Sequence, residues 1–77
     1  MLFPNVLATP IKQALTSMGA DLTEGKDTVF HGLFNSRMVI CYSRGDFVEI
    51  ICKHEPTYNQ ILQIVNLLVK DEENSEI

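Results

Sequence analysis

Hydrophobic residues near the start of the chain recur with the spacing of one helical face. Thr9 is a residue type that caps helices, Pro10 suits the first helical position, and Gly19 suits the left-handed residue that ends a helix. The apolar positions between them fall at i, i+3, i+4 and i+7: Ile11, Ala14, Leu15 and Met18. The pattern therefore predicts a first helix over residues 10–18, preceded by an apolar arm at residues 1–8.

A second helix is predicted near the end of the chain. Thr57 and Gln60 have the spacing of a capping box, in which each side chain bonds a free backbone N–H of the first turn. A wide apolar face follows, made of Tyr58, Ile61, Leu62, Ile64, Val65, Leu68 and Val69. A narrow polar stripe shares the same helix and is expected to face solvent: Asn59, Gln63, Asn66 and Lys70.

The segment between the two helices is rich in β-branched and aromatic residues and is divided by turn residues. It predicts strands at residues 28–34, 38–42 and 47–53, with an optional strand at residues 20–23. The expected fold is α+β: a small single domain over residues 1–70, built as helix, three- or four-stranded antiparallel meander, and helix.

The central hairpin has hydrophobic side chains on both faces. A two-residue turn with Arg44 and Gly45 at its tip pairs Tyr42 with Phe47. One face is then Val39, Cys41, Val48, Ile50 and Cys52; the other is Met38, Ile40, Tyr42, Phe47 and Ile51, interrupted by Glu49 and Lys53. A half-solvated sheet alternates apolar and polar residues, so the second face needs a cover. Either the two helices cover opposite faces, or another protein molecule covers one of them.

The net charge of −4 is concentrated at the end of the chain. Four of the ten acidic residues lie in residues 71–77, which leaves six acids and six bases in residues 1–70. We expect residues 71–77 to be an acidic, frayed tail, because negative charge is unfavourable at a helix C-terminus. A neutral body has no basic footprint, so nucleic-acid binding is not expected from charge.

Cysteine content and hydropathy indicate a cytoplasmic protein. The two cysteines, Cys41 and Cys52, lie inside apolar strands and are expected to be free thiols, as in a reducing compartment. No stretch approaches the ~20 apolar residues of a membrane span, and the N-terminal segment lacks the basic leader of a secretion signal.

Candidate catalytic or metal-binding residues are few. Cys52 and His54 share a strand face, but neither they nor His31 and Cys41 have the paired spacing of zinc ligands. Glu49 is not placed near a second carboxylate, and the isolated glycines make no phosphate loop. Residues 44–46 spell Arg-Gly-Asp, which resembles an integrin-recognition motif at a length of little specificity. We expect no enzyme activity, cofactor, metal or small-molecule substrate.

These patterns favour a small non-catalytic protein-binding module: a regulator or inhibitor that occludes or bridges a protein partner. Its size is typical of regulators encoded by bacteria, phages or mobile elements, and the partner is another protein or a second copy in a homodimer. The expected partner-binding residues are Met38, Ile40, Tyr42, Phe47 and Ile51, with Arg37 and Arg44 at the rim.

Two alternatives remain open from the sequence. The first is a structural subunit of a larger assembly, such as a virion or multiprotein complex, which docks on a neighbour through the apolar arm at residues 2–7. The second is a weak single-stranded nucleic-acid binder, in which Arg37 and Arg44 flank aromatic platforms at Phe34, Tyr42 and Phe47.

Overall fold

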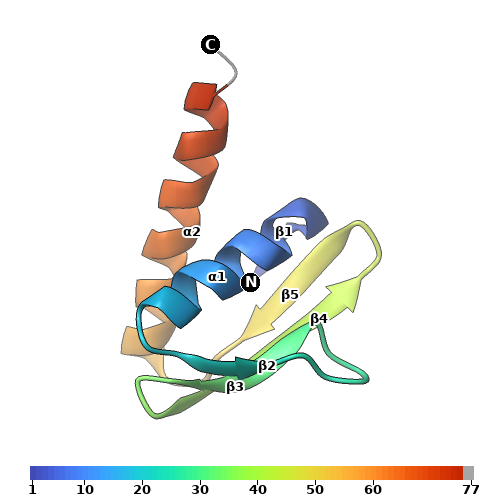
Figure 1. Ribbon diagram of the computed structural model, residues 1–77, viewed down its shortest axis with the longest axis vertical. Helices are drawn as coiled ribbons and strands as arrows, with labels where there is room; N and C mark the ends of the chain where they lie inside the picture. The colour runs from blue at the N-terminus through green and yellow to red at the C-terminus, as the bar shows by residue number, and fades with distance from the viewer. Residues whose placement is uncertain (76–77) are drawn as a thin grey trace.

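The computed structural model describes the backbone of residues 1–75 and the side chains of residues 1–70. The elements in chain order are β1 (Leu2–Pro4), a 3-10 turn η1 (Asn5–Leu7), α1 (Ala8–Ser17), β2 (Asp21–Thr23), β3 (Phe30–Phe34), β4 (Arg37–Arg44), β5 (Phe47–Ile51) and α2 (Glu55–Ser75). The strands form one antiparallel sheet in the order β1-β5-β4-β3-β2 (Figure 1). The predicted α+β fold is therefore confirmed, with one more strand than expected.

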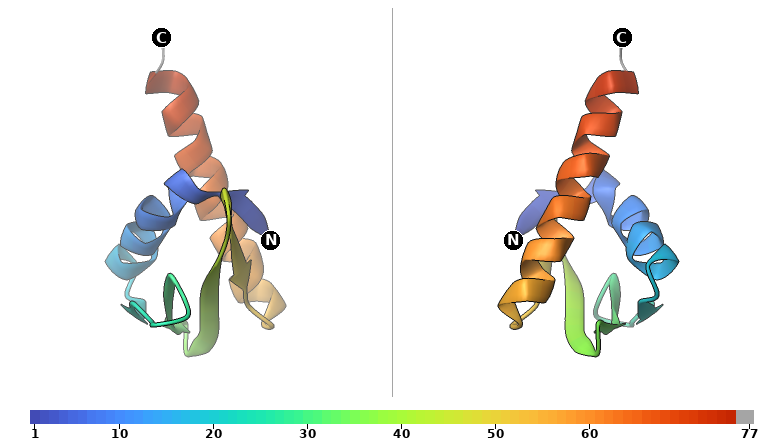
Figure 2. Two further views of the ribbon diagram at one scale, coloured as in Figure 1. Left: turned by 90° about the vertical axis from the view of Figure 1, so that its right-hand side faces the viewer. Right: turned by 90° about the vertical axis from the view of Figure 1, so that its left-hand side faces the viewer.

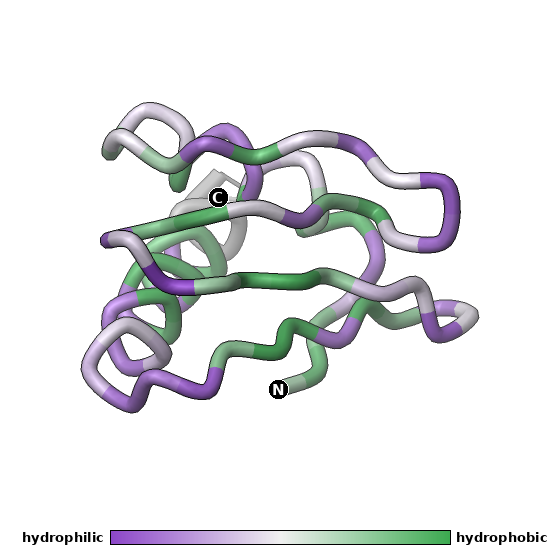
Figure 3. The backbone as a smooth tube through the Cα atoms, turned by 90° about the horizontal axis from the view of Figure 1, so that it is seen from below, coloured by the Kyte–Doolittle hydropathy of each residue, from purple (hydrophilic) through white to green (hydrophobic). Residues whose placement is uncertain are grey.

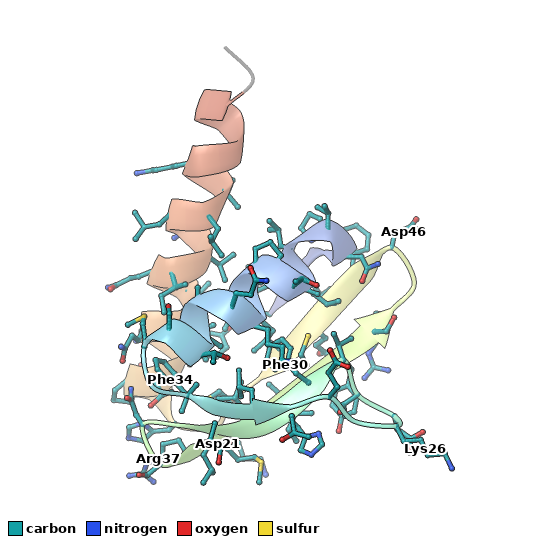
Figure 4. The ribbon with its side chains drawn as sticks, in the orientation of Figure 1. Asp21, Lys26, Phe30, Phe34, Arg37 and Asp46 are labelled. Carbon is teal, nitrogen blue, oxygen red and sulfur yellow. The ribbon has the colours of Figure 1, made fainter. Side chains whose placement is uncertain are left out.

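Both helices lie against the same face of the sheet, which we call the inner face (Figure 2). Phe30 and Phe34 are buried between α1 and the strands (Figure 4). A single hydrophobic core joins the helices to the sheet; its buried members are Leu7, Ala8, Ile11, Leu15, Ala20, Phe30, Phe34, Val39, Cys41, Val48, Ile50, Ile61 and Val65. The opposite face, called the outer face, has no helix over it within residues 1–75. The alternative in which the helices cover opposite faces is thus wrong.

The β4–β5 hairpin turns one residue later in the chain than the sequence predicted, which shifts the pairing register by two residues. Arg44 pairs with Phe47 and Tyr42 with Glu49, so Gly45 and Asp46 form the tip. Gly45 has a φ of 70°, and glycine at the first central position is what a type II′ turn requires. Arg44 at the first central position of the turn would place a residue with a bulky side chain in the positive-φ conformation. Because side chains alternate with a period of two, the slip of two residues leaves every face assignment unchanged.

The β3–β4 turn is equally short. Phe34 pairs with Arg37, and Asn35 and Ser36 between them both have positive φ values, 54° and 62°. Two consecutive positive φ values are typical of a type I′ hairpin turn. Arg37, which precedes the strand predicted at residues 38–42, is the first residue of β4.

Residues 1–8, expected to form an apolar arm, divide between the sheet and the first helix: Leu2–Pro4 form β1, Asn5–Leu7 form η1 and Ala8 begins α1. Leu2 pairs with Glu49 and Phe3 with Val48, which makes β1 an edge strand beside β5. Backbone bonds extend this pairing at both ends: the Ile50 N–H donates to the Met1 carbonyl at 2.9 Å, and the Asn5 N–H donates to the Asp46 carbonyl at 2.9 Å. Pro4 is tolerated because an edge strand needs ladder bonds on one side only.

Both predicted helix starts differ from the observed ones. The helix α1 begins at Ala8 with no side-chain cap, so Thr9 and Pro10 lie inside its first turn, where a missing N–H is harmless. The helix α2 begins at Glu55 rather than at a capping box. Thr57 is buried with its hydroxyl 2.8 Å from Nδ1 of His54, while the Gln60 side-chain oxygen accepts a bond from the Asn35 amide at 2.8 Å.

Gly32 lies in the middle of β3 and is paired on both sides. Its neighbours across the ladder are Leu22 on β2 and Val39 on β4. A Cβ atom built on Gly32 would meet the backbone carbonyl oxygen of Asp21 at 1.9 Å. Glycine is therefore required here for the close approach of β2 to the inner side of β3.

The helix α2 extends well beyond the rest of the body (Figure 2). We predicted that residues 71–77 fray. The side chains of residues 71–77 and the backbone of residues 76–77 lie outside the described part of the structure, so this stays a prediction. Among residues 1–75, neither helix has the length and hydrophobicity needed to cross a membrane.

Candidate functional site

The outer face of the sheet combines exposed hydrophobic residues from β3, β4 and β5. Met38, Phe47 and Leu33 are exposed to 57%, 50% and 47%, although each lies within a paired strand. Ile51 is also exposed, and Ile40 and Tyr42 are half-buried. Figure 3 views the sheet from below and shows hydrophobic residues along its neighbouring central strands. The same strands that line the core thus present a second hydrophobic surface.

One half of the outer face is apolar without interruption. Leu33 pairs with Met38, and Ile40 pairs with Ile51, while Met38 and Ile40 are neighbours on the same side of β4. We call these four residues the apolar patch: Leu33, Met38, Ile40 and Ile51. Side chains paired in this way are close enough to contact one another across the ladder. The patch is therefore continuous over three strands.

The other half, toward the β4–β5 turn, is mixed in character. The Arg44 Nε donates to Oε1 of Glu49 at 3.0 Å, and its Cζ lies 5.3 Å from the centre of the Tyr42 ring. These contacts hold the arginine along the outer face of its own sheet. The Arg-Gly-Asp tripeptide consequently has its arginine engaged within the protein, rather than free for an integrin-type contact.

A groove of about 470 Å³ opens at the edge of the apolar patch. It forms where β5 ends at Ile51 while β4 continues back to Arg37, so that the chain leaving β5 separates from β4 on its way into α2. We call it the basic groove; its lining residues are Arg37, Met38, Ile40, Ile51, Lys53 and His54.

His54 is held in place at the end of this groove. Its Nδ1 lies 2.8 Å from the Thr57 hydroxyl, and its carbonyl accepts the Tyr58 N–H at 2.9 Å. The carbonyl also accepts a long hydrogen bond from the Cys52 thiol, at 3.8 Å. The residue that precedes α2 is thereby fixed relative to the sheet.

The structure brings most of the predicted binding residues onto one surface. Met38, Ile40, Tyr42, Phe47 and Ile51 all belong to the outer face, and Arg37 and Arg44 lie at opposite ends of β4. Phe34, expected beside the aromatic residues of a nucleic-acid platform, is instead buried on the inner face.

Three further outer-face residues were missed: Leu2, His31 and Leu33. Leu2 was missed because a three-residue edge strand has too little periodicity to recognise. His31 and Leu33 alternate with the buried Phe30 and Phe34 along β3. This alternation was a signal that could have assigned them to the outer face.

The candidate catalytic and metal-binding residues are divided between the two faces of the sheet. Burial raises the pKa of the Cys41 thiol to about 11, so it stays protonated at neutral pH. His31 lies on the outer face and Cys41 on the inner face, because they pair with Ile40 and Phe30, respectively. The imidazole of His31 contacts the Thr28 hydroxyl at 3.0 Å. Within the described residues, no group of three His, Cys, Asp or Glu side chains is placed to hold a metal ion.

Comparison of this chain with protein-family models, with curated proteins and with solved structures finds no match.

Proposed function

We propose that this protein is a non-catalytic protein-binding module whose outer sheet face docks on a protein partner. The observation that supports the proposal is the hydrophobic surface over β3, β4 and β5, which has no helix over it within residues 1–75. In a small domain, a continuous hydrophobic patch rimmed by polar residues is typical of a protein-interaction site.

The residue types on this face also favour an interface. Met38, Tyr42 and Phe47 belong to the residue types enriched in protein–protein contacts, and Arg37 and Arg44 add the charged type most common there. Because the sheet and the core behind it form one small body, the face is presented as a pre-formed surface. Little ordering entropy is then lost on binding.

A domain of this size acts most simply by covering a functional surface of its partner or by joining two proteins. We therefore propose a small regulator or inhibitor. A homodimer through the same face would use the same chemistry, since a two-fold interface pairs a surface patch with itself.

The proposal is tested with two substitutions that place charge on the outer face, Met38→Glu and Phe47→Glu. Both side chains are about half exposed, so the fold should survive. A photo-crosslinking residue introduced at position 51 should give a discrete adduct, either with a partner in the producing cells or with a second copy. Each glutamate should abolish that adduct.

The matched control is Gln63→Glu on the exposed stripe of α2, with the crosslinker unchanged at position 51. It should leave the adduct intact. Light scattering after size exclusion then separates a homodimer from a complex with another protein. The proposal fails if position 51 gives no adduct, or if the adduct persists in either glutamate variant.

A further inference from the structure

The two halves of the outer face differ in how their positive charges are neutralised. In the mixed half, Arg44 is paired with Glu49 at 3.0 Å. At the basic groove, Arg37 and Lys53 are both exposed and form no ion pair within the described residues. Glu55 follows at the first turn of α2, but it makes no ion pair with either of them. The groove therefore combines a hydrophobic floor with a positively charged rim.

The shape of the groove suits a few side chains rather than a whole folded surface. Its volume of about 470 Å³ is that of a site for one short segment, and its floor is made by Met38, Ile40 and Ile51. The guanidinium of Arg37 offers a planar fork of N–H donors that fits a carboxylate, while Lys53 offers a compact point charge. Charge complementarity thus selects a negatively charged occupant, and the floor selects an apolar one.

We propose that the basic groove binds a peptide segment of the partner protein in which acidic residues flank apolar ones. The apolar side chains occupy the floor over Met38, Ile40 and Ile51, and the carboxylates contact Arg37 and Lys53. This inference rests on the proposed function and names the class of partner surface that the outer face recognises.

The backbone of α2 leads away from the groove within the same molecule. The helix α2 begins beside the groove at Glu55 and runs for 21 residues. At 1.5 Å per residue this is about 30 Å of helix. Figure 1 shows the helix carrying its C-terminal end away from the sheet. An acidic segment that reaches the groove must therefore come from another molecule.

The first experiment is a peptide-display selection of a random dodecapeptide library on the immobilised full chain. Selected peptides should be enriched in Asp and Glu together with Leu, Ile, Phe or Trp. Selection on the double variant Arg37→Glu plus Lys53→Glu should lose the acidic enrichment. Peptides selected for apolar residues without acidic ones, or no enrichment at all, would overturn the inference. Neither result would overturn the proposed function, which the adduct at position 51 tests independently.

The second experiment measures one selected peptide by fluorescence anisotropy. The double variant Arg37→Glu plus Lys53→Glu should weaken binding roughly tenfold or more, and added salt should weaken the wild-type complex. The neutral pair Arg37→Gln plus Lys53→Gln serves if the first variant does not fold.

The matched control changes the net charge equally at two exposed lysines away from the groove, Lys26→Glu plus Lys70→Glu. Figure 4 shows Lys26 and Arg37 at opposite ends of the sheet. The control should retain affinity within about twofold, because charges beyond a Debye length are screened. Equal weakening by the control pair would overturn the inference. A further outcome is that the wild type self-associates with rising concentration and that Arg37→Glu plus Lys53→Glu abolishes this self-association. The occupant of the groove would then be the acidic segment of a second copy, and the proposal that it belongs to a different protein would be overturned.

Discussion

The inner and outer faces of the sheet are made from the same strands and are both rich in hydrophobic residues, yet only one is a core. Phe30 on the inner face is 0% exposed, whereas Phe47 on the outer face is 50% exposed. The difference is whether helices cover the face. Hydrophobic content within a strand therefore identifies a surface that avoids water, but it does not say which molecule will cover that surface.

The charges on the two faces explain which one the helices cover. At its buried positions the inner side of the central strands carries Val39, Cys41, Val48 and Ile50, with no ionisable group other than the thiol; Arg37, which shares this side, lies exposed at the end of β4. The outer side carries Arg44 and Glu49 on β4 and β5 and His31 on β3. Burying those groups under a helix would remove them from water at a cost of several kcal/mol for a charged group. The helices α1 and α2 accordingly pack on the uncharged side.

The largest difference between the faces should appear when the same residue type is removed from each. Phe30→Ala should lower the free energy of unfolding by about 3–5 kcal/mol, since it leaves a cavity in the core. That is comparable with the entire stability of roughly 3–5 kcal/mol for so small a domain, so the variant should be largely unfolded. Phe47→Ala should cost less than about 1 kcal/mol, because its side chain is half exposed.

Urea unfolding followed by far-ultraviolet circular dichroism measures both variants, with Phe30→Leu as a milder inner-face change that keeps a measurable transition. Equal destabilisation by Phe30→Ala and Phe47→Ala would mean that the outer face is part of the core, and the docking proposal would lose its basis.

A smaller difference should appear in the pH dependence of stability, through the inner-face thiol. Burial raises the pKa of Cys41 from 9.0 to about 11. In the unfolded chain the thiol ionises near pH 9, while the folded protein keeps the proton. The contribution of the protonated Cys41 thiol to the free energy of unfolding is therefore complete below about pH 9 and is lost as pH rises toward about 11. Two pKa units correspond to about 2–3 kcal/mol.

The check is a comparison of wild type with Cys41→Ala by urea unfolding from about pH 8 to about pH 11, the range set by this shift. The stability advantage of the wild type should shrink by that amount across the range, because the alanine variant has no thiol to titrate. If the two unfolding curves change in parallel with pH, Cys41 does not titrate differently in the folded and unfolded states.

The smallest expected effect concerns the ion pair on the outer face. Glu49→Gln removes the partner of Arg44, but both side chains are partly exposed and well solvated. The free energy of unfolding should change by less than about 0.5 kcal/mol, as is usual for such pairs. Glu24→Gln, which removes the exposed pair with Lys12, is the matched control. A loss above about 1.5 kcal/mol for Glu49→Gln alone would indicate that this part of the outer face is more deeply buried than the fold implies.

Much of the local structure could be predicted from residue patterns. The two helices, the strands at β3, β4 and β5, and the optional strand at β2 were all expected near their observed positions. The faces of residues 38–42 and 47–51 were also predicted correctly, even though the turn was misplaced by one residue and the pairing register by two.

Three features could not be predicted because they depend on partners distant in sequence. The strand β1 is only three residues long, and it is ordered by pairing with β5 about 45 residues away in the chain. At the start of α2 the Thr57 hydroxyl contacts His54, and the Gln60 side chain accepts a bond from Asn35. Both side chains of the predicted capping box are therefore engaged with other partners. The basic groove exists because β4 extends past the end of β5. The ends of strands are the features that a residue pattern predicts least well.

The sequence by itself determined which side chains share a face of the sheet, since the alternation of a strand is a local property of the backbone and survives a slip of two residues. Only the tertiary structure decided that both helices cover the same face and that the other remains open. That choice depends on packing the helix faces against the strands, and on which side has the charges that resist burial. The charges at Glu49 and Lys53 are visible in the sequence, but the packing of the helix faces is not visible in the spacing of residues along one strand.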